Sequence, residues 1–124
     1  MDLTPRPIAD VLVFAPAGRL DHESVDDFRT NLQPQLDAAL VAGRAILFDL
    51  SELEYVSSAG LRCFMLAAKQ AKAANGRMAV AAPRQVVAEI FEISRFNMVF
   101  RIFPTLREAL GHLSADAAAV FERR

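Results

Sequence analysis

Residues 49–62, DLSELEYVSSAGLR, constrain the fold most, because they join a strand-like run to a helix-like run. Residues 44–50 (RAILFDL) are nearly all apolar and suit a buried strand, whereas residues 61–74 (LRCFMLAAKQAKAA) are dense in strong helix formers. Ser57 and Ser58 lie between the two runs and are expected to open the helix. In such sheets, binding sites lie beyond the carboxyl ends of strands, where helix amino-termini leave backbone N–H groups free. The junction is therefore the first candidate for a functional site.

The remaining chain alternates between strand-like and helix-like segments. Apolar runs predict three more strands, the last of them at a sheet edge: residues 8–15, 77–82 and 96–102. Helical spacing of apolar side chains predicts three more helices: residues 23–41, residues 83–94 and a final helix with Pro104 as its first residue. Because the connections between these elements are short, we expect parallel crossovers.

These elements predict an α/β fold, with a mixed sheet of four or five strands and about four helices packed mainly on one face. At 124 residues the chain is long enough to bury one core. We therefore expect a single domain over residues 1–124, with its core at about 8–113. Residues 114–124 show no clear apolar stripe, and the sequence leaves them either as a tail or as an extension of the last helix.

Composition limits the partners and the compartment. Lys and Arg total 14 against 15 Asp and Glu, so no basic surface favours nucleic acid or anionic lipid. Cys63 is the sole cysteine, which excludes an internal disulfide and suits a reducing cytoplasm. No apolar stretch approaches the roughly 20 residues that span a bilayer. We expect a cytoplasmic protein without membrane insertion, metal or cofactor.

The two serines invite different interpretations. The hydroxyl of Ser57 is placed to cap the helix, although the third residue onward is Gly60 rather than the Glu or Gln of a capping box. Ser58 has no structural duty that the sequence can name, and its functional interpretation is a phosphate acceptor on an exposed first turn. Gly60 costs about 1 kcal/mol relative to Ala inside a helix, which indicates close approach by a strand or by a partner backbone.

Several segments together resemble the STAS domain family, which contains the bacterial anti-sigma factor antagonists. The resemblance is carried by DLS at residues 49–51 and by YVSSAGLR at residues 55–62. It extends to AGRLD at residues 17–21, which is similar to the family's second-strand ending, and to EIFEI at residues 89–93, which is similar to its third helix.

The resemblance implies a switch that works by binding rather than by catalysis. Such an antagonist binds an anti-sigma factor with serine kinase activity, frees the sigma factor, and is turned off when that kinase phosphorylates it; a serine phosphatase is a second expected partner. The family motif is Asp-Ser-Ser-Gly-Leu with the second serine modified, and alignment on Gly60 places Ala59 at that position. Either Ser58 accepts the phosphate one position early, with Ser57 as second choice, or the switch is lost. The expected partner-binding residues are Asp21, Asp49, Ser57, Ser58, Ala59, Gly60 and Arg62.

Two alternatives stay open. A related branch of the family is not phosphorylated and serves as a small subunit of a lipid-transporting ABC system. More remotely, Ser57 or Ser58 with His22 and Asp49 would supply the nucleophile, base and orienting carboxylate of a serine hydrolase. The sequence lacks the Gly-x-Ser-x-Gly turn that usually exposes such a nucleophile, which argues against catalysis.

Overall fold

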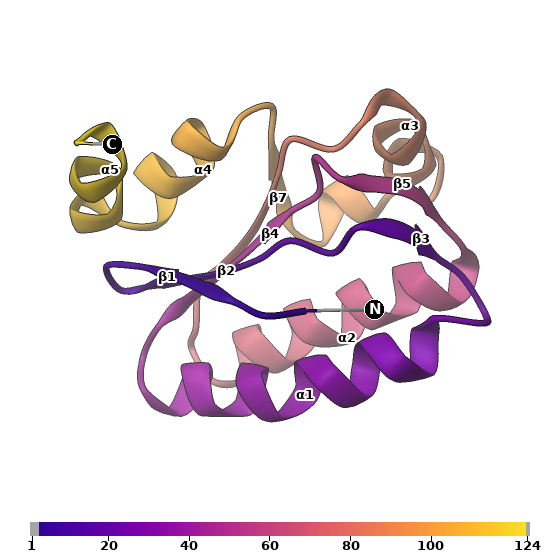
Figure 1. Ribbon diagram of the computed structural model, residues 1–124, viewed down its shortest axis with the longest axis horizontal. Helices are drawn as coiled ribbons and strands as arrows, with labels where there is room; N and C mark the ends of the chain where they lie inside the picture. Colours follow the sequence, from indigo (N-terminus) through magenta and orange to yellow (C-terminus); the bar gives the residue numbers. More distant parts are fainter. Residues whose placement is uncertain (1–2, 124) are drawn as a thin grey trace.

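The computed structural model describes residues 3–123. The chain forms a five-stranded sheet in the order β1-β2-β4-β6-β7 and a separate pair, β3-β5 (Figure 1). The strands are β1 (Arg6–Ile8), β2 (Val11–Phe14), β3 (Gly18–Leu20), β4 (Ala45–Asp49), β5 (Leu53–Val56), β6 (Met78–Ala81) and β7 (Arg101–Phe103). The described α-helices are α1 (Val25–Val41), α2 (Ser58–Ala73), α3 (Gln85–Ile93), α4 (Leu106–Leu113) and α5 (Ala115–Glu122).

The main sheet is mixed, as the sequence predicts. β1 pairs antiparallel with β2, whereas β2, β4, β6 and β7 are mutually parallel neighbours. The central strand β4 is apolar throughout its buried part, because both of its faces are covered by helices. The predicted strands at 44–50 and 77–82 are confirmed within a residue or two at each end.

Alternate residues of the strands supply two cores. On one face, Phe14, Ile46, Phe48 and Val80 pack with α1, α2 and α3. On the other face, the intervening residues of the same strands pack with α4 and α5, at the opposite side of the sheet in Figure 1. The fold class is confirmed: within residues 3–123, three α-helices pack on one face of the sheet and two on the other.

Phe64 of α2 is the centre of the larger core. Its ring lies 5.1 Å from that of Phe48, 5.8 Å from that of Phe28 and 6.0 Å from that of Phe91. All four side chains are fully buried. Such edge-on and tilted contacts add to the apolar area removed from water. They fix α2 against the sheet, and with it the position of the first turn of the helix.

The strand expected over residues 8–15 is confirmed for Val11–Phe14, but its first residues belong instead to a tight hairpin. Arg6–Ile8 pairs with residues 11–13, and Ala9 takes a left-handed conformation with φ 52° in the turn. Pro7 is tolerated because β1 lies at a sheet edge, where a missing N–H costs little. The apolar run continues across the two-residue turn, so the sequence pattern does not indicate that the chain reverses direction there.

Four other segments also differ from the prediction. β5 was missed between the central strand and α2, because a four-residue strand with exposed Glu54 resembles a loop. The strand expected over residues 96–102 is shorter and lies later in the chain, at Arg101–Phe103, because Phe96–Met98 forms a 3-10 helix. Pro104 precedes α4, whose N-cap is Thr105. The tail forms a separate helix, α5.

Candidate functional site

The candidate site lies where β3 and β5 end together. The two strands are parallel, and Leu20 is the register partner of Val56. The next backbone step continues the pairing, because the Ser57 N–H donates to the Leu20 carbonyl over 2.8 Å. Parallel strands place their carboxyl ends at one edge, so Asp21 and the start of α2 follow at the same end of the molecule.

Ser57 caps α2, as the sequence predicts. It has extended backbone dihedral angles, and its Oγ accepts a hydrogen bond from the Gly60 N–H over 3.3 Å. Its carbonyl accepts the first helical hydrogen bond, from the Leu61 N–H, over 2.9 Å. A side-chain cap of this kind stabilises a helix by about 1 kcal/mol. The hydroxyl of Ser57 is therefore engaged in holding the turn.

Ser58 differs from Ser57 in every respect that matters for modification. It is the first residue of α2, its side chain is exposed, and its hydroxyl makes no hydrogen bond within residues 3–123. The first turn of α2 contains no acidic residue. Its free N–H groups and positive dipole end are thus not neutralised by a carboxylate of the helix itself, and a negative group there would be favoured.

The residues after Ser58 determine how closely the first turn of α2 packs against the strands. Gly60 is buried, and a Cβ at this position would lie 2.8 Å from Val56 Cγ2 and 2.9 Å from Leu20 Cγ. The prediction of close approach by a strand is confirmed. Ala59 is half-buried, whereas Arg62 is exposed one helical turn beyond Ser58. Only Ser58 and Arg62 therefore present polar groups freely to solvent on this part of α2.

Asp21 organises the neighbouring turn. Its Oδ1 accepts hydrogen bonds from the Glu23 N–H over 3.0 Å and from the Ser24 N–H over 3.3 Å. Partial desolvation raises the pKa of Asp21, but these two N–H groups and the charges of His22 and Arg19 outweigh it and lower the pKa below its usual value. The carboxylate stays ionised at neutral pH and holds the start of α1 beside the first turn of α2.

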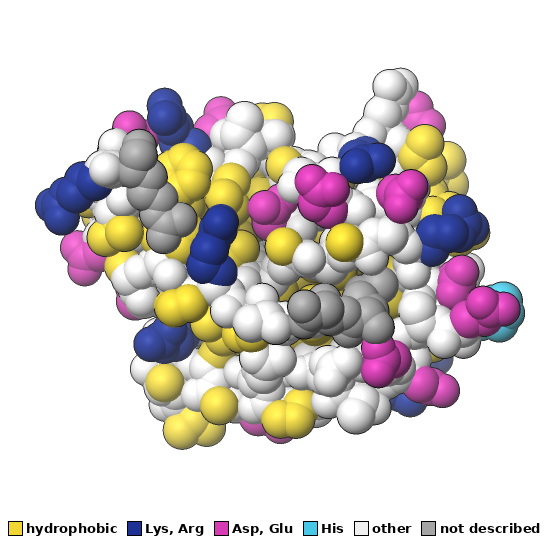
Figure 2. All heavy atoms as spheres, in the orientation of Figure 1, with side chains coloured by type: hydrophobic (Ala, Val, Ile, Leu, Met, Phe, Trp, Pro, Cys, Tyr) yellow, Lys and Arg dark blue, Asp and Glu magenta, His cyan; other side chains and the backbone are white. Residues whose placement is uncertain are grey.

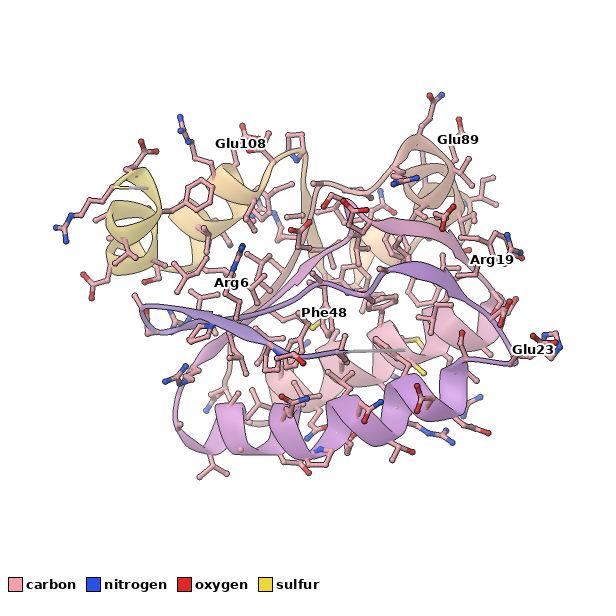
Figure 3. All side chains as sticks on the ribbon, viewed as in Figure 1. Arg6, Arg19, Glu23, Phe48, Glu89 and Glu108 are labelled. Atoms are coloured by element: carbon pink, nitrogen blue, oxygen red, sulfur yellow. The ribbon has the colours of Figure 1, made fainter. Side chains whose placement is uncertain are left out.

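Arg19 and Tyr55 are site residues that the sequence reasoning missed. The Arg19 guanidinium lies over the Tyr55 ring, 4.3 Å from its centroid, and its Nε is 3.7 Å from Asp21 Oδ2. Figure 3 shows Arg19 projecting from β3 at the end of the molecule where α2 begins. The two residues are register partners across the β3-β5 pair. Only recognition of β5 could have revealed this pairing.

Asp49 lies away from the other expected site residues. It ends β4, whereas Ser58 follows the far end of β5, a strand that spans about 13 Å (Figure 1). Its Oδ1 accepts a hydrogen bond from the Ser51 N–H over 3.1 Å, which is the turn-forming role that its position predicts. The structure therefore brings Asp21, which follows β3, to the same end of the molecule as the expected residues at the start of α2, and it leaves Asp49 at the opposite end of β5.

The arrangement does not assemble a hydrolase triad. Within residues 3–123 neither His22 nor Asp49 hydrogen-bonds to either serine, and the hydroxyl of Ser57 serves as the helix cap. The described part of the chain also holds no group of three or more His, Cys, Asp or Glu residues that could bind a metal ion. Cys63 is buried, and desolvation raises the pKa of its thiol, which keeps it protonated.

The surface is mixed in charge. On the face shown in Figure 2, basic and acidic side chains are interspersed. No helix among residues 3–123 has both the length and the apolar character needed to cross a membrane.

Comparison with known proteins gives consistent matches over most of the chain. The family model described as STAS domain matches residues 4–109. BtrV of Bordetella bronchiseptica, named provisionally as an anti-sigma factor antagonist, is 32% identical over 102 residues, which cover 82% of this chain and 85% of BtrV. α5 lies beyond the residues that the family model matches.

Solved structures share the fold. A Thermotoga maritima protein, also described provisionally as an anti-sigma factor antagonist, superposes with a TM-score of 0.82 at 19% identity, covering 90% of this chain and 93% of that protein. The phosphorylated form of the Bacillus cell fate determinant SpoIIAA superposes with a TM-score of 0.66 at 19% identity, covering 91% of this chain and all of SpoIIAA. These two structures establish a common architecture.

Proposed function

The chain belongs to the STAS domain family, and from this premise we propose that it is a phosphorylation-switched anti-sigma factor antagonist. In this role it binds an anti-sigma factor with serine kinase activity and so frees a sigma factor. Phosphorylation by the bound kinase ends the interaction, and a serine phosphatase restores it. The binding surface is the turn formed by Asp21, Ser57, Ser58, Ala59, Gly60 and Arg62, and Ser58 is the acceptor.

One observation carries the proposal: Ser58 exposes a free hydroxyl on a helix amino-terminus that has no acidic residue in its first turn. A phosphate adds about −1.5 to −2 charge. The helix dipole and free N–H groups stabilise such a charge, typically by 0.3 to 1 kcal/mol at an exposed site. Arg62, one turn further on, adds a cation within reach of the same side of the helix. The folded domain should therefore tolerate the modification.

Phosphorylation of Ser58 should be tolerated by the folded domain but should weaken the binding of a partner. A partner that covers the first turn of α2 must bury the phosphate, and an unpaired buried charge costs several kcal/mol. Binding is thereby lost while the fold persists. The same reasoning disfavours Ser57 as the acceptor, because its Oγ already accepts from the Gly60 N–H and modification there would disturb the cap.

The test is phosphate transfer from a partner kinase. With such a kinase and ATP, the protein should gain one phosphate on the tryptic peptide that contains Ser57 and Ser58, measured by mass spectrometry. Ser58→Ala should abolish incorporation, whereas Ser57→Ala, as the matched control, should retain it with some loss of helix stability. Unchanged incorporation in Ser58→Ala would overturn the assignment of the acceptor.

Ala59 favours a second candidate, a STAS subunit of a lipid-transporting ABC system that works without phosphorylation. Alignment on Gly60 puts Ala59 where the family motif carries the modified serine. The two candidates predict different partners in a pull-down from native lysate. A histidine-kinase-like ATPase supports the antagonist, and a transporter ATPase supports the second candidate. No phosphate incorporation with a verified partner kinase also favours the second candidate.

A further inference from the structure

The two edges of the main sheet are protected differently. β1 forms one edge and carries Pro7 at its centre, which has no N–H to offer an incoming strand; α5 also packs against β1. β7 forms the other edge and contains no proline. Within residues 3–123, β6 is the only strand that pairs with β7. β7 is therefore the edge that can still accept a strand.

The register of β7 shows which backbone groups are free. The Phe103 carbonyl accepts from the Ala82 N–H over 2.8 Å, so the backbone groups of Phe103 face β6. Backbone groups alternate in direction along a strand, and those of Arg101 therefore face the same way. The N–H and C=O of Ile102 point to the open side. An added strand would pair with Ile102.

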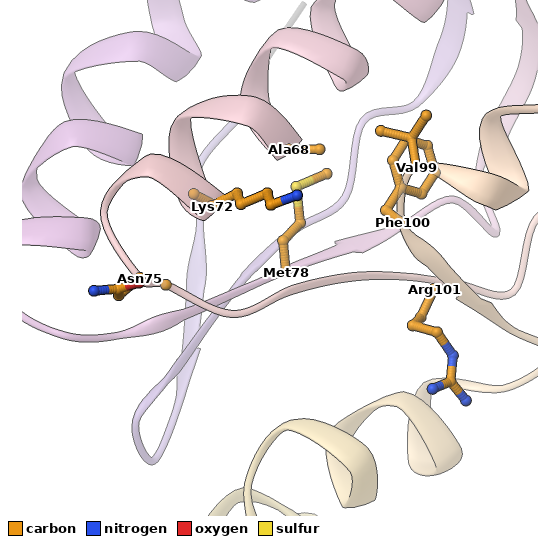
Figure 4. A pocket seen from close by; sticks show the side chains of 9 residues that line it. Ala68, Lys72, Asn75, Met78, Val99, Phe100 and Arg101 are labelled. Carbon is orange, nitrogen blue, oxygen red and sulfur yellow. The ribbon is translucent and has the colours of Figure 1, made fainter.

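A hollow lies beside this edge, between the last turns of α2 and the segment that leads into β7 (Figure 4). Its volume is about 370 Å³. Met78 and buried Phe100 supply apolar surface, and Val99 stands at the rim with 46% of its surface exposed. In Figure 4 Lys72 reaches across Met78, opposite Val99 and Phe100. An apolar side chain from an added strand would fit here.

The charges around the hollow have one sign. Lys72 and Arg101 both line it, and neither makes an ion pair within residues 3–123. No Asp or Glu lines the hollow. The Arg101 guanidinium lies 5.3 Å from the centroid of the Phe103 ring and points away from Lys72 (Figure 4). The two cations thus flank the edge on different sides, where alternate side chains of an added strand would also point.

We propose that β7 is a docking edge for an extended acidic segment of a partner protein that carries carboxylates on both of its faces and one apolar side chain on the face toward the hollow. The segment pairs with the backbone of Ile102, places one apolar side chain against Met78 and Phe100, and directs carboxylates to Lys72 and Arg101. Main-chain hydrogen bonds supply affinity in this mode, and the side-chain pocket and cations supply specificity.

This docking edge is separate from the first turn of α2, where Ser57 and Ser58 lie. Ser58 and Lys72 lie fourteen residues apart in α2, which corresponds to about 21 Å along the helix. Binding at β7 should therefore persist when Ser58 is modified, and it does not depend on the proposed function. Loss of one interaction can be distinguished experimentally from loss of the other.

The test uses a fluorescein-labelled peptide, Ser-Glu-Glu-Val-Glu-Glu-Ser, titrated with the full chain and followed by anisotropy. In a strand, the Val and two of its Glu point to one side and the other two Glu point to the opposite side. Saturable binding with a Kd below about 1 mM is expected. Lys72→Glu and Arg101→Glu together should weaken it about tenfold or more. Lys69→Glu, an exposed α2 position that does not line the hollow, is the matched control and should bind as the parent does. A second control peptide has Lys in place of every Glu. Its affinity for the parent protein should be no higher than the affinity of the charge-reversed variant for the acidic peptide.

A second readout locates the contact. The outward N–H of Ile102 should exchange with solvent more slowly when the acidic peptide is bound, because it gains a hydrogen-bond acceptor. Absence of binding, equal binding by the parent and the charge-reversed variant, or binding without protection of Ile102 would each overturn the proposal. Thermal melting of each variant confirms that the exposed substitutions leave the fold intact.

Discussion

Gly60 fixes how closely the first turn of α2 approaches the β3-β5 pair. Its missing side chain leaves room for Val56 and Leu20, and the Leu20 carbonyl would lie 3.0 Å from an added Cβ. Two branched side chains and a backbone atom surround the position, so few movements could relieve the crowding. The glycine is therefore required by packing, because its φ is not in the left-handed range.

Gly60→Ala should accordingly destabilise the protein. Overpacking of a tight contact typically costs 1 to 3 kcal/mol, and we expect a loss of about 2 kcal/mol in the free energy of unfolding, measured by urea denaturation. The better helix propensity of Ala offsets only part of this loss.

Gly111→Ala is the matched control, because a Cβ at Gly111 in α4 would meet no atom within 4 Å. There the helix propensity acts alone and should stabilise the protein by about 0.5 to 1 kcal/mol. Equal effects of the two substitutions would show that Gly60 is not held by packing.

At the residue scale, part of the candidate site could be predicted from the sequence. The Ser57 cap and the close contact at Gly60 were predictable, because capping and helical glycine depend on neighbouring residues. The Arg19 and Tyr55 stacking was not, since it depends on register between two strands that are distant in the chain. The distance between Asp49 and Ser58 was likewise set by a strand that the sequence did not reveal.

At the scale of elements, a polar link joins three parts of the fold. Asp10 in the β1–β2 turn accepts a hydrogen bond from the Ser114 hydroxyl, and its Oδ2 lies 3.2 Å from Arg77 Nη2. Arg77, which precedes β6, also donates to the Leu113 carbonyl at the end of α4. Ser114 further caps α5 by accepting from the Ala117 N–H over 3.1 Å. The link fixes the α4–α5 junction to the sheet.

This link predicts a pH-dependent contribution to stability. The Ser114 hydrogen bond lowers the pKa of Asp10, desolvation opposes it, and Arg77 lowers it further. Because the folded pKa is below the unfolded value of about 3.9, the contribution is complete above that value and disappears as pH falls through the folded pKa.

Asp10→Asn should therefore have a lower Tm than the parent at pH 7, and the difference should narrow once the pH is below about 4. The exposure of Asp10 and Arg77 keeps the effect modest. Thermal melts of both proteins from acid to neutral pH check the prediction. A difference in Tm that stays constant over this range would exclude the ionised link as its cause.

Long elements were predicted better than short ones. α1, α2 and β4 carry enough residues for a periodic or apolar signal, and their positions are confirmed. The hairpin, β5 and the 3-10 helix each span four or fewer residues per segment, and their conformations depend on tertiary contacts. Phe96, for example, stacks on Phe100 at 6.3 Å rather than extending as a strand.

At the scale of the molecule, the proposed function assigns folding and recognition to different parts of α2. Its buried face, centred on Phe64, holds it in the core, while its first turn is exposed at the carboxyl ends of β3 and β5. A charge added at Ser58 is thus distant from the apolar contacts that stabilise the fold. The central claim is that this turn controls binding without controlling folding.

The most direct test compares Ser58→Asp with the parent in a melting curve and in a titration with an anti-sigma factor that binds the parent. The helix amino-terminus should tolerate the carboxylate, so the Tm should be nearly unchanged. Affinity for the partner should fall tenfold or more, a change of about 1.4 kcal/mol, because the partner must bury the charge. A Tm far below that of the parent, or an affinity equal to that of the parent, would contradict the account.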